Sequence, residues 1–293
     1  MGISKYPSKV TLPKAEKPFP TILDFLERRF PYISRGEWAQ RIALGKILDW
    51  DGNSITFDSK YVPFKGIFYF REVEKERLIP FQEEILFQNG DILVACKPHF
   101  LPVTPGGVYV DECLLNRLRQ RTGVDYLAPV HRIDRGTAGI VMFSVNKKTS
   151  GLYHALFRNG KAEKTYHALS RCDYDQKRSE WFVENRIVKG EPWFRMRTVP
   201  GVPNSCSRIK LVEYIDNLAR FELSPLTGQT HQLRIHMSGL GFGILNDRYY
   251  PELQPESVDN YDSPLQLIAK KLKFIDPVTG KNMEFKSERT LLY

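Results

Sequence analysis

The chain has 293 residues, 42% hydrophobic and 26% charged, which is ordinary for a folded, soluble protein, and no apolar run approaches the roughly 18–20 residues of a membrane span. Four scattered cysteines without a C-x-x-C pair argue against a zinc site or a disulfide framework and fit a reducing cytoplasm. The 43 basic residues exceed the 34 acidic ones, and the resulting net charge of +9 suits a polyanionic partner, although such a mild excess is equally common in proteins that do not bind nucleic acid.

The N-terminal quarter of the chain predicts a small domain of its own. Residues 1–20 contain four lysines and four prolines but no apolar core, so they predict a flexible basic arm and not a secretory signal. Residues 21–75 predict two helices, capped at their starts by Thr21 and Ser34. Gly45 closes the second helix, and a short strand and an Asp-Gly turn follow it.

Basic side chains are in excess in this N-terminal part. Residues 1–75 carry 13 basic and 9 acidic side chains, a difference of +4. Arg35 and Arg41 lie on or beside the predicted helices, where they can follow a phosphate backbone. Charged helices that merely face solvent are the alternative interpretation. Residues 74–77 and Pro80 form a polar break that predicts a linker.

The larger predicted domain spans residues 80–293. It opens with a hairpin over residues 85–96, with the turn Gln88-Asn89-Gly90-Asp91 between its strands. Lys97-Pro98 and a proline-rich loop follow the hairpin. Two amphipathic helices are predicted over residues 113–120 and 149–158.

Between those helices lies the motif His131-Arg132-Ile133-Asp134-Arg135-Gly136-Thr137-Ala138-Gly139. The apolar run Ile140–Phe143 behind it predicts a buried strand, so Asp134 falls where a loop turns into a strand. The neighbouring arginines favour the ionised form of the acid, and a carboxylate held charged beside a pocket is a ready nucleophile. A structural ion-pair turn is the alternative.

This nonapeptide resembles the signature H-R-[LI]-D-R-x-[TS]-[SA]-G of the RluA family of pseudouridine synthases, and agrees at all eight restricted positions. The resemblance implies that Asp134 is the catalytic aspartate. It also implies a mixed α+β catalytic domain built on a curved, largely antiparallel sheet. Residues 34–52 resemble the S4-like RNA-binding module, a small α/β domain commonly found ahead of this catalytic domain.

Two further stretches resemble the same family. Lys164-Thr165-Tyr166-His167-Ala168-Leu169 is similar to its K-x-Y-x-A-L strand, which implies that Tyr166 lies in the active site. An aromatic ring there can stack on an extruded uracil, although a core tyrosine is the alternative. Residues 227–236 are similar to T-G-R-T-H-Q-[IL]-R-[VI]-H, which implies that Arg234 pairs with Asp134. We expect Thr230 to cap a helix there.

The chain departs from the family pattern at three positions. Gln229 replaces an arginine, Asn246 a common glycine, and Ile268 a usual histidine. We expect these changes to affect the choice of substrate more than the chemistry. His231 and His236 would point to different helix faces, so we expect no metal site, and the isomerisation needs no cofactor.

The sequence therefore predicts an RNA pseudouridine synthase of the cytoplasm that acts on structured ribosomal or transfer RNA. The expected RNA contacts come from six residues: Arg132, Arg135, Arg35, Arg41, Lys164 and His231. Two alternatives remain open. One is a non-catalytic RNA-binding protein that kept the fold, and the other is an unrelated RNA hydrolase that uses His131, Asp134 and His231 as acid–base groups.

Overall fold

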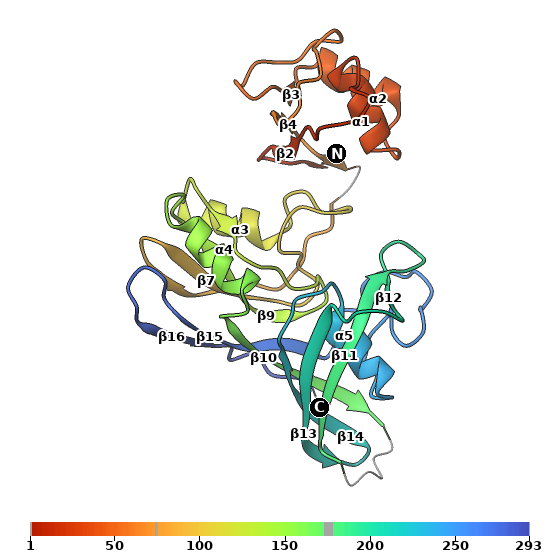
Figure 1. Ribbon diagram of the computed structural model, residues 1–293, viewed down its shortest axis with the longest axis vertical. Coiled ribbons are helices and arrows are strands. Elements are labelled where there is room, and N and C mark those ends of the chain that lie inside the picture. The colour runs from red at the N-terminus through yellow and green to blue at the C-terminus, as the bar shows by residue number, and fades with distance from the viewer. Residues whose placement is uncertain (1, 74–75, 173–177, 293) are drawn as a thin grey trace. The chain divides into compact units, whose positions relative to one another are not determined.

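The structure is a computed structural model that describes residues 2–73, 76–172 and 178–292 (Figure 1). The chain divides into two compact units, one formed by Met1–Arg77 with Gly106–Asp111 and the other by Leu78–Pro105 with Glu112–Tyr293. The division near residue 77 falls in the polar break that predicts a linker; Glu74 and Lys75 of that break lie outside the described residues. The sequence did not indicate that the segment Gly106–Asp111 groups with the N-terminal unit.

The N-terminal unit contains two helices, α1 (Ile22–Arg29) and α2 (Arg35–Ala43). Both predicted caps are confirmed, because the Thr21 hydroxyl accepts from the backbone N–H of Asp24 and the Ser34 hydroxyl accepts from that of Glu37. The strands pair in the order β2-β4-β3, and a separate two-stranded sheet pairs β1 with β5. The strand bounds are β1 (Gly2–Ile3), β2 (Ser8–Thr11), β3 (Ile47–Leu48), β4 (Gly66–Tyr69) and β5 (Glu72–Val73).

The predicted flexible arm is wrong for part of residues 1–20. Ser8–Thr11 form β2, which pairs antiparallel with β4, and Leu12 is fully buried. The polar composition concealed a four-residue strand whose side chains alternate between partly buried and exposed. Its backbone hydrogen bonds and the burial of Leu12 hold this part of the segment against the rest of the unit.

The second unit is built on a sheet of eleven strands within the described residues, in the order β12-β11-β13-β14-β10-β15-β9-β7-β6, with β16 beside β15 and β8 beside β9. Every pairing in it is antiparallel except that of β15 with β9. The strand bounds are β6 (Glu84–Gln88), β7 (Ile92–Lys97), β8 (Ala128–Pro129), β9 (Ala138–Ser144), β10 (Glu163–Arg171), β11 (Glu180–Lys189), β12 (Met196–Val199), β13 (Ser205–Ile215), β14 (Leu218–Pro225), β15 (Leu267–Ile275) and β16 (Asn282–Lys286).

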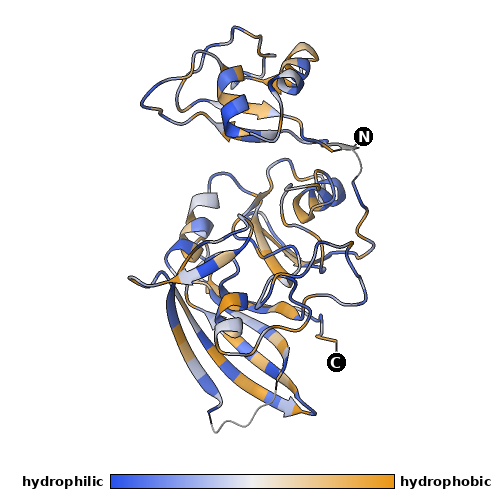
Figure 2. Cartoon of the chain, turned by 90° about the vertical axis from the view of Figure 1, so that its right-hand side faces the viewer, coloured by the Kyte–Doolittle hydropathy of each residue, from blue (hydrophilic) through white to orange (hydrophobic). Residues whose placement is uncertain are grey.

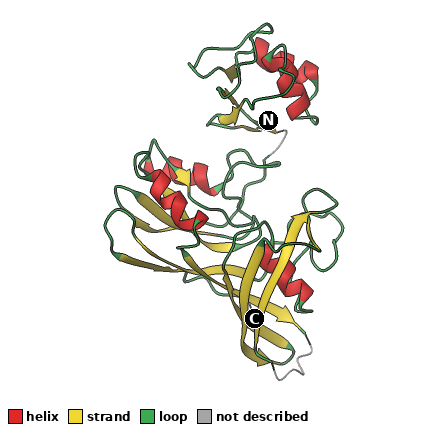
Figure 3. Cartoon of the chain, in the orientation of Figure 1, coloured by secondary structure: helices red, strands yellow, loops and turns green. Residues whose placement is uncertain are grey.

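The helices of this unit are α3 (Leu114–Thr122), α4 (Ser150–Arg158) and α5 (Gln232–Gly239) (Figure 3). Hydrophobic and hydrophilic residues alternate along the long strands (Figure 2), which gives each strand one apolar face. Leu233 and Met237 of α5 join one apolar cluster with Phe221 and Leu223 of β14. This packing fixes α5, and therefore Arg234, against the sheet.

The predicted start of α5 is wrong. The helix begins at Gln232, and its N-cap is His231, which has φ 55° and makes no capping hydrogen bond with its side chain. The Gln232 side chain holds the preceding turn instead, because its Oε1 accepts from the Gln229 backbone and from the Thr227 hydroxyl. His231 therefore lies just outside the helix, and its side chain lines the cavity.

The fold is thus mixed α+β, with a large, mostly antiparallel sheet and few helices, as the sequence predicted. Among the described residues, no helix is long and apolar enough to cross a membrane.

Candidate functional site

Asp134 lies in the loop that leads from β8 into β9, at the wall of a cavity of about 530 Å³. The Thr137 backbone N–H donates to the Asp134 carbonyl at 3.1 Å and closes a tight turn there. The cavity is lined by side chains from the Asp134 loop, from β10, and from the loop that precedes α5. The tertiary fold therefore gathers three motifs that are far apart in the sequence.

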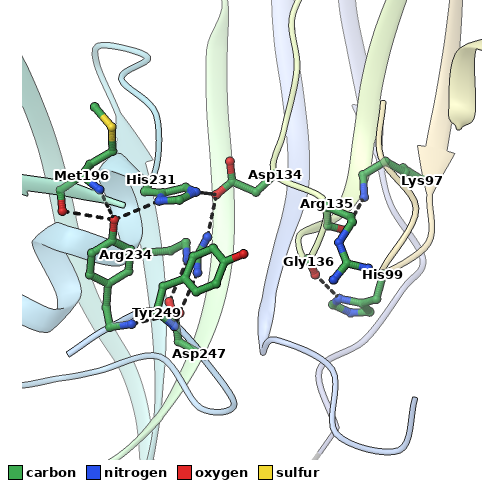
Figure 4. Close-up of polar contacts among 11 residues, drawn as sticks. Lys97, His99, Asp134, Arg135, Gly136, Met196, His231, Arg234, Asp247 and Tyr249 are labelled. Carbon is green, nitrogen blue, oxygen red and sulfur yellow. Dashed lines mark hydrogen bonds and ion pairs between the residues drawn. The ribbon is translucent and has the colours of Figure 1, made fainter. Parts of the chain in front are cut away.

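Arg234 connects Asp134 to a second carboxylate, Asp247 (Figure 4). Its Nη1 lies 3.3 Å from Oδ2 of Asp134, while its Nε and Nη2 donate to both oxygens of Asp247 at 2.7 and 2.6 Å. The Arg234 and Asp247 side chains are 7% and 1% exposed, whereas that of Asp134 is 25% exposed. Asp247 is thus the tight partner, and Asp134 keeps one oxygen, Oδ1, without a hydrogen bond to the described residues.

These contacts determine the charge states of Asp134 and Arg234. Burial alone would raise the pKa of Asp134, but the charges of His231, Arg234 and Arg132, with the Arg234 hydrogen bond, hold it below its usual value. Burial lowers the pKa of the Arg234 guanidinium, yet its hydrogen bonds to Asp247 outweigh burial and raise it. Burial lowers the pKa of His231, while the charge of Asp134 acts in the opposite direction.

His231 is held by Tyr250. Its Nδ1 lies 2.9 Å from the Tyr250 hydroxyl, and its Nε2 lies 3.9 Å from Oδ2 of Asp134. The Tyr250 hydroxyl also accepts from the Met196 backbone N–H at 2.7 Å. These contacts aim the imidazole at the carboxylate from the side that Arg234 does not occupy (Figure 4).

Tyr166 and Lys164 line the same cavity from β10. The period of two along a strand predicts that they share a face, and both do line the cavity. Burial, and to a smaller extent the charge of Asp134, raises the pKa of Tyr166. The Tyr166 hydroxyl therefore keeps its proton at neutral pH and can donate a hydrogen bond.

Six of the nine predicted site residues line the same cavity. Asp134, Tyr166, Arg234, Arg132, Lys164 and His231 all line the cavity. Arg135 instead makes a two-point ion pair with Asp259, at 2.8 Å for each contact. Arg135 thus binds another carboxylate and does not line the cavity.

Arg35 and Arg41 belong to the N-terminal unit, where carboxylates bind both. Nη1 of Arg35 lies 2.9 Å from Asp24 and 2.7 Å from Glu27. Arg41 lies 3.6 Å from Glu72, and its guanidinium is 5.0 Å from the centre of the Trp38 ring. A phosphate would have to compete with these acids for either arginine.

His131 has a structural environment. Its Nε2 accepts from the Met142 backbone N–H at 3.1 Å, and its ring stacks on Phe157 with a centroid distance of 4.4 Å. Burial lowers its pKa to about 3, so the ring stays neutral near pH 7. These contacts argue against a hydrolase that uses His131 as an acid–base group.

The three departures from the family pattern have different settings. Asn246 has φ 63°, a left-handed conformation that asparagine tolerates better than most residues, so it can stand where glycine is common. Ile268 is 1% exposed and packs with Ala138 and Leu169. Gln229 lines the cavity, and its side-chain amide donates to the Asn204 carbonyl at 3.2 Å.

Sequence reasoning missed Asp247, Tyr250 and Lys97. Lys97 is fully buried, and its amine donates to three backbone carbonyls, including that of Arg135 beside Asp134. The sequence pointed to Asp247 only through its position next to Asn246, in a stretch compared with the family pattern. The order of residues along the chain does not indicate which arginine a given carboxylate will bind. A search of the described residues finds no group of three or more His, Cys, Asp or Glu side chains that could hold a metal ion.

Comparison with known proteins shows to which family the chain belongs. A sequence model of the RNA pseudouridylate synthase family matches residues 91–239. The dual-specificity RNA pseudouridine synthase RluA of Haemophilus influenzae is 31% identical over 226 residues, which cover 70% of this chain and 92% of that one. The protein of the same name from Escherichia coli K12 is 30% identical over 211 residues, which cover 69% and 91%.

Two solved structures share the fold over most of the chain. Human RNA pseudouridylate synthase domain containing 1 aligns with a TM-score of 0.59 at 24% identity, over 73% of this chain and 86% of that one. Human RNA pseudouridylate synthase domain containing 4 aligns with a TM-score of 0.55 at 23% identity, over 70% and 88%. With the family model matching more than half of the chain and the bacterial relatives at 30% identity or above, the chain belongs to the RluA-type family of RNA pseudouridine synthases.

Proposed function

We propose that this enzyme converts specific uridines of structured RNA, ribosomal or transfer, to pseudouridine, and that Asp134 is its catalytic carboxylate. One observation carries the proposal: a carboxylate with a lowered pKa lies at the wall of the cavity, and one of its two oxygens has no hydrogen bond to the described residues. An RNA substrate would be met in the cytoplasm, where we expect the enzyme to act.

The reaction breaks the bond between N1 of uracil and C1′ of the ribose, and forms a bond between C5 and C1′. The proton on C5 is lost and N1 gains one, so the product is an isomer of the substrate. An ionised carboxylate can attack the uracil ring or take a proton from the sugar, and both routes need the charge on Asp134. Arg234 supplies that charge state, and Asp247 fixes the direction of Arg234.

Tyr166 offers the freed uracil a flat surface and a proton donor in the same cavity as Asp134. Extrusion of the base from its stack costs a few kcal/mol, and less in a loop than in a duplex. Arg132 is exposed and Lys164 is partly buried at the cavity wall, so both can hold the flanking phosphates. These contacts would offset the cost of extrusion.

We also propose that the N-terminal unit is an S4-like RNA-binding module. Its two capped helices and its basic excess support this role. The family model begins at residue 91 and therefore leaves this unit outside its match. Removal of Met1–Arg77 should weaken RNA binding more than it slows the reaction of bound RNA, which single-turnover rates at saturating RNA would measure.

The first test is chemical mapping of pseudouridine in total RNA from cells with and without the gene. Cells that express only Asp134→Asn should lack the same sites as the deletion, because asparagine keeps the shape and removes the charge. The purified Asp134→Asn protein should still bind the RNA. Turnover within about tenfold of the wild type would contradict the assignment of Asp134, since loss of an essential charge costs far more.

Loss of no site in the deletion strain would point to the non-catalytic alternative. The family comparisons do not favour that alternative. Asp134, Tyr166 and Arg234 are also all present in one cavity.

A further inference from the structure

Four aromatic rings form a continuous row from the side of Asp134 to the protein surface. The row runs from His231 to Tyr249, then to Phe194 and to Trp193. The successive ring centroids are 5.6, 5.2 and 5.9 Å apart. Tilted and edge-on aromatic rings at such distances support one another, so the row is one continuous feature and not four separate side chains.

The inner end of the row belongs to the site already described. The Tyr249 ring lies over the Arg234 guanidinium, with Cζ 4.9 Å from the ring centroid (Figure 4). The Tyr249 backbone N–H donates to Oδ1 of Asp247 at 2.8 Å. The row therefore begins on the same arginine and carboxylate that position Asp134.

The outer end of the row is an exposed tryptophan. Trp193 lies in the connection between β11 and β12 and is 73% exposed, while Phe194 beside it is partly buried. The planes of these two rings are 83° apart, so they do not stack face to face. Tryptophan is enriched at binding interfaces, because its ring offers a large apolar contact and one polar N–H.

The segment that carries Trp193 is basic. Residues 186–197 contain four basic side chains, Arg186, Lys189, Arg195 and Arg197, and one acidic side chain, Glu191, a difference of +3. The Arg195 side chain is already bound within the protein, because it donates a hydrogen bond to the Pro251 carbonyl at 3.0 Å. The Arg197 side chain belongs to an exposed residue and makes no hydrogen bond or ion pair with the described residues.

We propose that this row is a stacking platform for the RNA strand beside the target uridine, in which Trp193 stacks on the base of a flanking nucleotide and Arg197 binds a phosphate. The proposal rests on the proposed function for its ligand. Single-stranded nucleic acid is bound by aromatic faces interleaved with cations, and this segment has both features. A protein partner would also use an exposed tryptophan, but the charge of the segment and its continuity with the site favour RNA.

The test is the binding of a fluorescein-labelled twelve-nucleotide oligouridylate, measured by anisotropy. Trp193→Ala should weaken binding about tenfold, in the range of one lost stacked base. Trp193→Phe should bind within about threefold of the wild type, because it keeps an aromatic face. Phe182→Ala, which removes another exposed aromatic ring in the same unit (53% exposed), is the matched control and should not change binding.

Salt dependence separates the two components of the platform. Trp193→Ala should leave the slope of log K against log salt unchanged, since stacking releases no counterions. Arg197→Gln should reduce that slope by about 0.7, the value for one contact with a single-stranded phosphate. Unlabelled oligouridylate should quench tryptophan fluorescence in the wild type more than in Trp193→Phe.

A second measurement is kcat/KM on an RNA that carries a mapped site, which should fall about tenfold in Trp193→Ala. Equal affinity and equal kcat/KM of Trp193→Ala and the wild type would overturn the platform. A wild-type enzyme that binds oligouridylate through Trp193 but modifies no RNA would overturn the proposed function and leave the platform standing. Equal losses in Trp193→Ala and Phe182→Ala would indicate a general surface effect and would overturn the platform.

Discussion

Arg234 lies between two carboxylates that it binds unequally. Asp247 takes two of its nitrogens at 2.6 and 2.7 Å, whereas Asp134 takes one at 3.3 Å. A buried guanidinium needs a full counter-charge, and Asp247 supplies it. Asp134 therefore lies beside a fixed positive charge but makes only one contact with it. Its other oxygen remains available to the substrate.

Asp247→Ala should lower the free energy of unfolding by about 3–5 kcal/mol, because it leaves a buried arginine without its tight partner. The measurement is urea denaturation at pH 7. Asp262→Ala removes an exposed carboxylate from the same unit and should change stability by less than about 0.5 kcal/mol. Equal stability of the two variants would show that the Arg234–Asp247 pair contributes little.

Tyr166→Phe separates stacking from proton transfer. We expect kcat to fall by at least about a hundredfold with KM little changed, because phenylalanine keeps the flat ring but has no proton to donate. Tyr126→Phe is the control, since the Tyr126 hydroxyl binds Ser150 outside the cavity. A Tyr166→Phe enzyme with normal kcat would assign Tyr166 to stacking alone.

At the scale of elements, the site depends on the pairing of β9 with β15, which is the one parallel pairing of this sheet among the described residues. Ala138 and Gly139 of β9 pair with Ile268 and Ala269 of β15. A Cβ on Gly139 would lie 2.2 Å from the Ala269 carbonyl oxygen, and its φ of 108° is one that side chains rarely adopt. This glycine lets β15 approach the strand that starts directly after the Asp134 loop.

Gly139→Ala should therefore destabilise the protein by about 3 kcal/mol or more, through overpacking and a strained backbone. The expected result is a lower midpoint of thermal unfolding and less protein in the soluble fraction. Gly90→Ala is the matched control, because a Cβ at Gly90 meets no atom within 4 Å. A Gly139→Ala protein as stable as Gly90→Ala would mean that β15 can move away without cost.

At the scale of the whole molecule, buried histidines make stability depend on pH. Burial lowers the pKa of His99 and His236 to about 4 and that of His131 to about 3. The unfolded chain takes up protons on these rings below about pH 6.5, while the folded chain does not. The free energy of unfolding should therefore fall as the pH drops from 6.5 towards 4.5, by at most about 1.4 kcal/mol per pH unit for each ring.

Urea denaturation at pH 7.5, 6.0 and 5.0 measures this slope. His131→Gln should be less stable at pH 7.5 but should show a shallower slope, because one ring no longer titrates. Asp134 does not contribute in this window, since a carboxyl with a lowered pKa loses its stabilising effect only below its usual value. The same stability at pH 7.5 and pH 5.0 would contradict the buried, neutral state of these histidines.

Short-range patterns determined much of this protein. The caps at Thr21 and Ser34, the hairpin before Lys97 and the alternation on β10 each depend on a few neighbouring residues, so the sequence was sufficient to predict them. The resemblance of three motifs to the RluA family predicted the fold class and the reaction. It also predicted the contact between Arg234 and Asp134, which are 100 residues apart.

Only the tertiary structure decided the rest. Asp247 binds Arg234, Arg135 turns to Asp259, and the row from His231 reaches Trp193 because strands and loops distant in the chain meet in the folded unit. Such contacts join side chains with no periodic relation in the sequence. The residue type determines the chemistry of each side chain, but the packing of α5 on the sheet determines which side chains come into contact. That packing depends on many weak contacts between residues far apart in the sequence, which a local sequence pattern does not predict.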